Sequence, residues 1–329
     1  MKITKDFLWK QDMSVNDFLE RLGNVGFQSV ELKNASDLIV KMKSSGAKIY
    51  LTFTSNMVTS GLRGFFAQLI KLNIPQVIVT TAGAIEEDIM KAFGEKFEIA
   101  SFHSDDVELH EKGENRVGNL IIRNESYMKF EDWIIPVLKE LYNKKKRWSV
   151  SELLKEIGLK LAPNQVGLRE GVPSKESNEN SILYQAAKNN IPIFCPGITD
   201  GTLGFQLFMF QEKHPDFIID VVQDFKNIIF VSNHDEKKAL IALGGSISKH
   251  HALLSGLLNG GFSYVIYMTT AHVTSGSMSG ATTQEAKSWG KIKDDSDAVT
   301  VIGDVSINFP LAMCNALDVL KNRNLLNES

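Results

Sequence analysis

The chain has 329 residues, of which 43% are apolar and 23% charged, and its net charge is −3. These values are those of a soluble globular protein and give no support for nucleic acid as a generic partner. Cys195 and Cys314 have no Cys-x-x-Cys neighbour, no apolar run approaches the length of a membrane span, and no signal-peptide core is present, so we predict a cytoplasmic protein without a thiolate metal site.

Helix and strand patterns alternate through the first third of the chain. Ser14 to Asp17 has the pattern of a capping box, and Gly23 ends the helix that it begins. Further expected elements are a helix over 36–45, a strand over 48–53, a helix over 64–72, a strand over 76–81 and a helix over about 86–93. Successive strand–turn–helix units predict parallel strands, and ligands bind beyond the carboxyl ends of such strands.

The rhythm continues after a polar stretch, 103–119, that we expect to be irregular. A helix over 130–142 contains Pro136, and Ser149 to Glu152 forms a second capping-box pattern. Residues 162–178 have the composition of a loop. The remaining expected elements are strands over 191–195, 240–243, 264–269 and 299–302, and helices over 203–211 and 248–258. We therefore expect one doubly wound α/β domain over residues 1–329, with a mostly parallel sheet and helices on both faces.

A lysine behind an aromatic residue is the first candidate for chemistry. Lys291 follows Trp289 and Gly290, and Glu285 lies six residues earlier. A lysine that loses solvation beside an aromatic wall can be neutral and can attack an imine carbon. The alternative is a core tryptophan, a turn and a solvated lysine. The small-residue loop 275–280 just upstream would let a ligand approach the backbone.

Three polar clusters have both a structural and a functional interpretation. Glu86, Glu87 and Asp88 start a helix, where acids are favoured by the helix dipole, but they could also hold a cation and ribose hydroxyls. His250 and His251 point about 100° apart on a helix, so they predict packing or proton transfer rather than a metal site. Asp200 is either a turn or cap residue or a ligand contact.

No Gly-x-Gly-x-x-Gly follows any predicted strand, so the patterns alone do not predict a dinucleotide. A longer match to a known family does indicate a dinucleotide. Segments in one order over about residues 45–315 resemble deoxyhypusine synthases: 54–56, 80–83, 86–88, 115–119, 129–133, 199–204, 246–251, 264–271, 285–291 and Asp304.

That resemblance implies a Rossmann-like fold, NAD as cofactor, no metal, and a homotetramer (a dimer of dimers) with active sites between paired subunits. It implies that an aminobutyl group passes from spermidine to an enzyme lysine and then to a lysine of the precursor of translation factor IF5A. Lys291 matches the enzyme lysine, and His250 would move protons. NAD would be held by Ser55, Asn56, Met57, Val58, Thr59, Thr81, Ala82, Gly83, Glu87, Asp200, Thr270, Ala271, Asp304 and Val305. The amine would be held by Glu86, Glu87, His250, Gly276, Ser279, Glu285 and Trp289.

The sequence departs from the family at the amine site. Phe205, Ser275 and Met278 stand where the family has aspartates, and Thr282 stands where an arginine is common. A polyamine site normally needs carboxylates to offset desolvation of the cation. The alternatives are therefore a homospermidine synthase-like or agmatine-using transferase, or a catalytically silent regulatory subunit.

Overall fold

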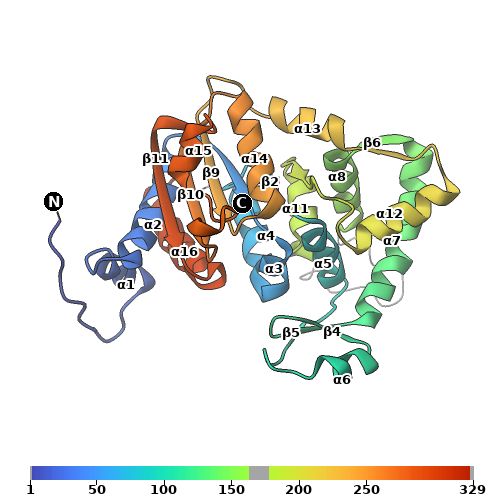
Figure 1. The fold of residues 1–329 in the computed structure, drawn as a ribbon, viewed down its shortest axis with the longest axis horizontal. Helices are drawn as coiled ribbons and strands as arrows, with labels where there is room; N and C mark the ends of the chain where they lie inside the picture. Colours follow the sequence, from blue (N-terminus) through green and yellow to red (C-terminus); the bar gives the residue numbers. More distant parts are fainter. Residues whose placement is uncertain (1, 163–177, 327–329) are drawn as a thin grey trace. The chain divides into compact units, whose positions relative to one another are not determined.

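The computed structural model describes residues 2–162 and 178–326 (Figure 1). Its internal contacts form two compact units. Unit 1 comprises Met1–Phe53, Leu72–Val79 and Ile228–Ser329, and unit 2 comprises Thr54–Lys71 and Thr80–Asn227. The predicted loop 162–178 lies, except at its two ends, outside the described residues.

Unit 1 is built on a parallel sheet. Its strands are β1 (Lys48–Thr52), β2 (Val77–Val79), β9 (Lys238–Leu243), β10 (Phe262–Thr269) and β11 (Ile292–Ile302). They run in the order β11-β10-β9-β1-β2, and each neighbouring pair is parallel. Every residue of β9 is buried, which is the pattern of a parallel strand covered on both faces.

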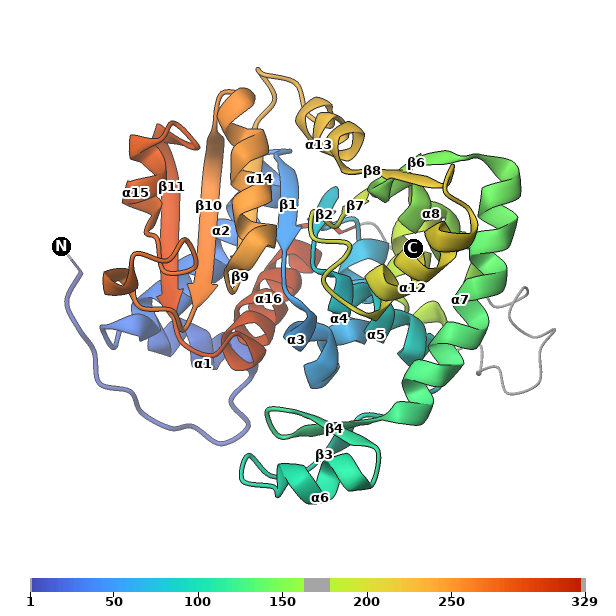
Figure 2. The same cartoon turned by 45° about the vertical axis from the view of Figure 1, so that its right-hand side comes forward.

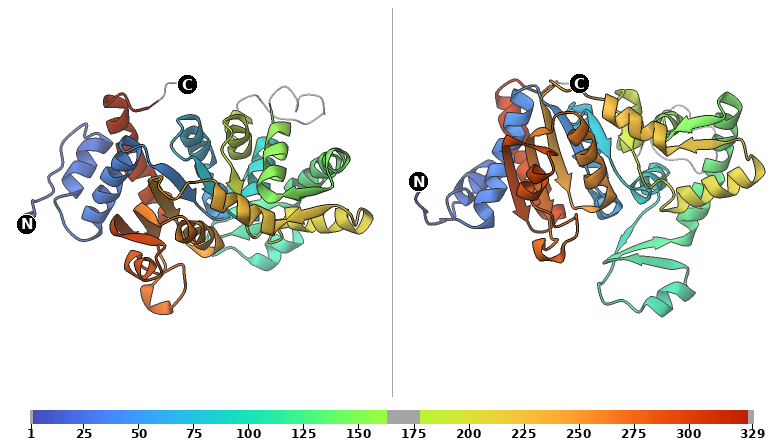
Figure 3. Two further views of the ribbon diagram at one scale, coloured as in Figure 1. Left: turned by 90° about the horizontal axis from the view of Figure 1, so that it is seen from above. Right: turned by 45° about the horizontal axis from the view of Figure 1, so that its top comes forward.

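Helices cover both faces of this sheet. They are α1 (Val15–Leu22), α2 (Gln28–Ser44), α14 (Ser246–Leu258), α15 (Thr283–Ser288) and α16 (Val305–Asn322), with a short 3₁₀ turn, η2 (Val273–Ser275). Helix α14 packs on β1, β2 and β9, whereas α2 and α16 pack on each other and on β10. Figures 2 and 3 show α14 on one face of the strands and α2 with α16 on the other. The expected α/β class with a mostly parallel sheet is confirmed.

Unit 2 is mainly helical. Its helices are α3 (Ser55–Met57), the π-helical turn η1 (Val58–Leu62), α4 (Arg63–Lys71), α5 (Ala82–Ala92), α6 (Asp106–Glu111), α7 (Asn124–Lys144), α8 (Val150–Lys160), α11 (Ile182–Lys188), α12 (Thr202–Lys213) and most of α13 (Val221–Phe230). Its strands are β3 (Glu98–Ile99), β4 (Glu114–Val117), β5 (Leu120–Arg123), β6 (Arg147–Ser149), β7 (Ile193–Phe194) and β8 (Ile218–Asp220). The buried ion pair of Arg63 with Asp88 ties α4 to α5, and Asp88 also accepts hydrogen bonds from the first turn of α11.

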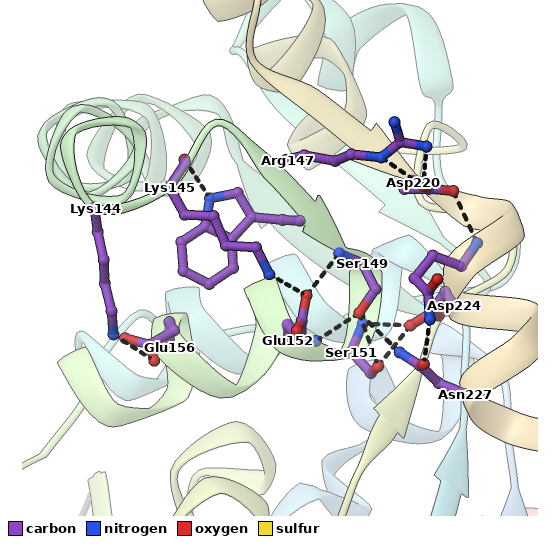
Figure 4. Close-up of polar contacts among 12 residues, drawn as sticks. Lys144, Lys145, Arg147, Ser149, Ser151, Glu152, Glu156, Asp220, Asp224 and Asn227 are labelled. Carbon is purple, nitrogen blue, oxygen red and sulfur yellow. Dashed lines mark hydrogen bonds and ion pairs between the residues drawn. The ribbon is translucent and has the colours of Figure 1, made fainter. Parts of the chain in front are cut away.

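The predicted cap of α8 is confirmed. Ser149 and Glu152 exchange hydrogen bonds in a capping box, and Asp224 of α13 accepts a bond from the backbone N–H of Ser151 (Figure 4). The basic run just before it is solvated and ion-paired: Lys145 contacts Glu152, while Lys144 and Arg147 pair with Glu156 and Asp220 (Figure 4). This run is therefore part of a surface network of ion pairs.

Two expectations are wrong. The stretch 103–119 is not irregular, because it contains α6 and β4, and β4 pairs antiparallel with β5. Helix α2 begins at Gln28 rather than near residue 36. The sequence does not indicate this start, because the N-cap residue Phe27 gives no side-chain capping signal. No helix in the described ranges is both long and apolar enough to cross a membrane.

Candidate active site

The triplet Trp289-Gly290-Lys291 ends helix α15. The N–H of Gly290 donates to the carbonyl of Lys287 at 2.8 Å, and the N–H of Lys291 donates to the carbonyl of Ala286 at 3.1 Å. This pair of bonds is a Schellman motif, which needs a left-handed residue at its centre. Gly290 supplies it with φ +68°. The glycine therefore turns the chain sharply between the tryptophan and the lysine.

The turn exposes the tryptophan and buries the lysine. Trp289 is 63% exposed and Lys291 is 5% exposed. This is the reverse of a core tryptophan followed by a solvated lysine, so that alternative is wrong. The Nζ atom of Lys291 lies 5.2 Å from the centroid of the Trp289 ring, within range of a cation–π contact. A buried amine beside an aromatic face is the arrangement expected of a nucleophilic lysine.

His250 lies on α14 within electrostatic range of this lysine. Burial lowers its pKa below the usual value, and the charge of Lys291 lowers it further. At neutral pH the imidazole is thus neutral and can accept a proton. The neighbouring His251 is more deeply buried, and burial lowers its pKa to about 4.

The small-residue loop of unit 1 packs against the N-terminus of α14. The Oγ of Ser279 accepts a hydrogen bond from the N–H of Ser246 at 2.9 Å. Gly276 has φ +68° and open space around its Cα. Glu285 is exposed in the first turn of α15, where its N–H donates to the Oγ of the N-cap residue Thr282. The loop thus presents small groups, and the first turn of α15 adds one solvated carboxylate.

The other predicted residues of unit 1 lie at two neighbouring strand ends. Thr270 and Ala271 follow β10, and Asp304 and Val305 follow β11. These two strands pair up to their last residues, and the N–H of Gly303 donates to the carbonyl of Thr269 at 3.0 Å. Asp304 caps α16 through the N–H of Ser306 at 2.7 Å. The structure therefore brings these residues together at the ends of two paired strands, and the ligand that they hold stays a prediction.

In unit 2, the segment 55–59 lies against the start of α5. The Oγ of Thr81, the N-cap residue of α5, accepts a hydrogen bond from the N–H of Ser55 at 3.0 Å. A Cβ on Gly83 would lie 2.8 Å from the Cβ of Ser55, so only glycine allows this approach. Neither Thr54 nor Thr81 makes a side-chain cap to the helix that it begins. Helix N-termini without a side-chain cap are suited to a phosphate group, so this segment fits a dinucleotide.

Glu87 is buried beneath this segment. Its Oε2 lies 2.6 Å from the Oγ of Thr59, and that Oγ is also 3.0 Å from the carbonyl of Ser55. Thr59 has one proton, so both contacts are hydrogen bonds only if Glu87 is protonated. Burial raises the pKa of Glu87 to about 7, which agrees with a proton on this carboxyl at neutral pH. The Nζ of Lys91 donates a hydrogen bond to the carbonyl of Val58 at 2.6 Å, which attaches this segment to α5.

Glu86 and Asp200 lie at the start of α12. The Oε2 of Glu86 accepts a hydrogen bond from the N–H of Leu203 at 2.8 Å, and a Cβ on Gly201 would collide with it. Burial raises the pKa of Glu86 to about 7, and the charge of Asp200 adds to the increase. Glu86 therefore caps a helix, whereas Asp200 is exposed.

Sequence reasoning missed the role of one residue at this site, Lys249. Its side chain is buried, and its Nζ contacts three backbone carbonyls of the loop 278–281. The available signal was a lysine within the mostly apolar helix that carries His250.

The described site residues form two sets, one in each unit.

Comparisons with known proteins agree on one family. The family model of deoxyhypusine synthase matches residues 17–316. A protein of Thermoplasma volcanium named probable deoxyhypusine synthase is 36% identical over 314 residues, covering 95% of this chain and 96% of the relative. The deoxyhypusine synthase of Senecio vernalis is 40% identical over 275 residues, covering 82% and 70%.

A solved structure agrees in fold. The crystal structure assigned to a deoxyhypusine synthase of Entamoeba histolytica superposes with a TM-score of 0.65 at 25% identity, covering 96% of this chain and 97% of that one. The family match spans almost the whole sequence and includes both sets of site residues. The chain belongs to the deoxyhypusine synthase family.

Proposed function

We propose that this chain is an NAD-dependent transferase that moves an aminobutyl group from spermidine, or a related amine, through Lys291 to a lysine of the IF5A precursor. The observation that carries the proposal is the buried Nζ of Lys291, which lies 5.2 Å from the Trp289 ring and near a neutral His250. Family membership makes the chain an enzyme of the transferase class. The donor, the cofactor and the acceptor are proposals.

Lys291 acts as the nucleophile in this scheme. Its amine attacks the imine carbon formed from the donor, and the bond from that carbon to the departing amine breaks. When spermidine is the donor, 1,3-diaminopropane leaves and an aminobutyl imine remains on Lys291. The acceptor lysine then displaces Lys291 by the same exchange. His250 accepts the proton released at each attack and returns it to the departing nitrogen.

NAD, when bound, would accept the hydride that oxidation of the donor releases and would return it to the imine on the acceptor lysine, so the transfer has no net oxidation. The residues that would hold it are those that offer N–H groups to phosphates or carboxylates to hydroxyls. The uncapped N–H groups at the start of α5 suit the pyrophosphate, and Gly83 allows close approach of the backbone. Asp304 and Asp200 would accept hydrogen bonds from ribose hydroxyls.

Amine choice is where the chain departs from its family. Phe205 is 57% exposed and Met278 is 37% exposed, so neither apolar side chain is needed to fill a core. Glu285 is a solvated carboxylate that remains available for a cation, whereas Glu86 is already engaged as a cap. We therefore propose weak use of spermidine and preference for an amine with fewer or differently placed charges, with agmatine as one candidate.

The proposal includes a cytoplasmic homotetramer, as in the family. It is tested by incubating the purified chain with NAD and spermidine, agmatine or putrescine, with and without an IF5A precursor. NADH formation and mass spectrometry of the precursor report oxidation and transfer separately. Transfer to the precursor supports the proposal, and transfer to a small amine favours a homospermidine synthase-like enzyme. Absence of both, together with no increase in melting temperature with millimolar NAD, would favour a silent subunit.

A further inference from the structure

Lys249 is a buried cation that binds backbone carbonyls. It is 2% exposed, and its Nζ lies 3.2, 3.4 and 3.1 Å from the carbonyl oxygens of Met278, Ser279 and Ala281. Among the residues that the structure describes, no carboxylate forms an ion pair with it at 4.0 Å or less. An ammonium group has three donors, and three carbonyls of one loop satisfy them.

An aromatic ring lies against the same ammonium. The Nζ of Lys249 is 3.8 Å from the ring centroid of Tyr267, a residue of β10 that is 1% exposed. Burial lowers the pKa of Lys249 to about 8, and the charge of Lys291 contributes to the decrease. The cation–π contact and the charge-assisted hydrogen bonds offset part of this desolvation. The loop is thus attached to the sheet through one side chain.

The loop fits α14 with little spare room. A Cβ on Gly245 would lie 2.3 Å from the Cβ of Ser279, and a Cβ on Gly280 would lie 2.2 Å from the carbonyl oxygen of His272. Contacts this close leave one register for the loop once Lys249 has bound its carbonyls. The loop leads through Thr282 directly into α15, and Lys291 follows three residues after the last residue of that helix.

We propose that Lys249 is a positioning residue for the amine substrate: it holds the loop 276–281 in the register that sets the position of Ser279 relative to His250. This inference rests on the proposed function. His250 is the next residue on α14, so one turn of helix carries both the group that fixes the loop and the group that moves the proton.

The chain contains a matched control. Lys238, the first residue of β9, is also fully buried. Its Nζ lies 2.9, 3.1 and 2.8 Å from the carbonyl oxygens of Asn233, His234 and Glu236. Both lysines therefore hold a loop of unit 1 by three carbonyls. Only the loop held by Lys249 carries predicted substrate-binding residues.

The experiment compares Lys249→Ala with Lys238→Ala. We expect both to lower the melting temperature, and only Lys249→Ala to raise the KM for the amine donor, by about tenfold or more, while kcat changes less. n-Propylamine replaces the atoms removed by Lys249→Ala, so it should lower that KM again, whereas n-propanol should not. Equal KM changes in the two variants, or no change in Lys249→Ala, would overturn the proposal.

A second measurement does not depend on activity. Hydrogen exchange should accelerate over residues 272–282 in Lys249→Ala and over residues 231–238 in Lys238→Ala. If Lys249→Ala does not fold, Lys249→Met keeps most of the volume without the charge and takes its place. Unchanged exchange over 272–282 would overturn the positioning role. If the exchange pattern is as expected but the wild type turns over no amine, the proposed function is refuted and the role of Lys249 in holding the loop is not.

Discussion

Trp289 and Lys291 lie two residues apart with opposite exposures, 63% and 5%, and with the lysine Nζ 5.2 Å from the indole ring. The left-handed Gly290 between them produces this inversion. The aromatic ring is therefore available at the surface to a ligand, while the amine that would react is withdrawn from bulk water. The one turn therefore presents both a stacking surface for a substrate and an enclosed amine beside it.

Lys291→Arg should abolish transfer and leave the fold intact. Arginine keeps the positive charge but stays protonated, so it cannot attack an imine carbon. Borohydride trapping with labelled amine, followed by peptide mapping, should place the label on Lys291 in the wild type and nowhere in the variant. Lys287→Arg is the control, because the Nζ of Lys287 donates to the carbonyl of Asp294 on the exposed side of α15. Label on another residue, or full activity of Lys291→Arg, would refute the assignment.

Gly290→Ala should impair both stability and transfer. An alanine in the left-handed region costs about 1–2 kcal/mol of folding free energy, and relief of that strain would rotate Lys291 away from its buried position. Gly46→Ala is a matched control, because Gly46 has the same φ of +68°, also follows a helix and has no neighbour within 4 Å of an added Cβ. Urea denaturation should give similar losses for both variants, and only Gly290→Ala should lower kcat. Equal activity of the two variants would show that the turn does not position the lysine.

Much of the fold could be predicted because its signals are local. The capping boxes at Ser14 and Ser149 and the continuous apolar run of β9 each depend on residues that are adjacent in sequence. The start of α2 was missed because Phe27 has φ +50° and gives no polar capping signal. The β4–β5 hairpin was also missed, because β4 is polar without a buried residue and β5 is an apolar strand of only four residues.

The candidate site was predicted only in part, for a related reason. The positions after β10 and β11 follow from strand ends, and the structure brings them together. The exposure of Trp289 and the burial of Lys249 depend on contacts between segments distant in sequence, including Tyr267 and the loop at Ser279. Composition and spacing do not record such contacts.

Glu87 should make stability depend on pH. Its pKa is about 7 in the folded protein and near 4.5 when unfolded, so the folded state binds more protons between these values. The free energy of unfolding should therefore fall as pH rises from 4.5 to 7, by about 3 kcal/mol from this group. Glu87→Gln removes that contribution. The free energy of unfolding of the wild type minus that of the variant should therefore decrease over the same pH range. Denaturant titrations at pH 5, 6, 7 and 8 measure it, and a difference that is constant with pH would contradict the assignment.

The last prediction concerns the amine pocket. If Phe205 and Met278 have replaced acids, the double variant Phe205→Asp/Met278→Asp should restore spermidine use. Each regained ion pair is expected to contribute about 1–3 kcal/mol, or about tenfold or more in KM. Both side chains are exposed, so the new carboxylates carry little desolvation cost and the fold should tolerate them.

Phe208→Asp is the control for this experiment, because Phe208 lies one turn further along α12, is 53% exposed and has its ring centroid 6.2 Å from that of Phe205. It adds the same charge to the same helix at a position with no expected role. We expect spermidine-dependent NADH formation to rise in the double variant and to stay unchanged in Phe208→Asp. An equal rise in both would indicate general attraction of a cation by added negative charge. Efficient wild-type turnover at micromolar spermidine would mean that other acids, such as Glu285, already compensate for the missing aspartates.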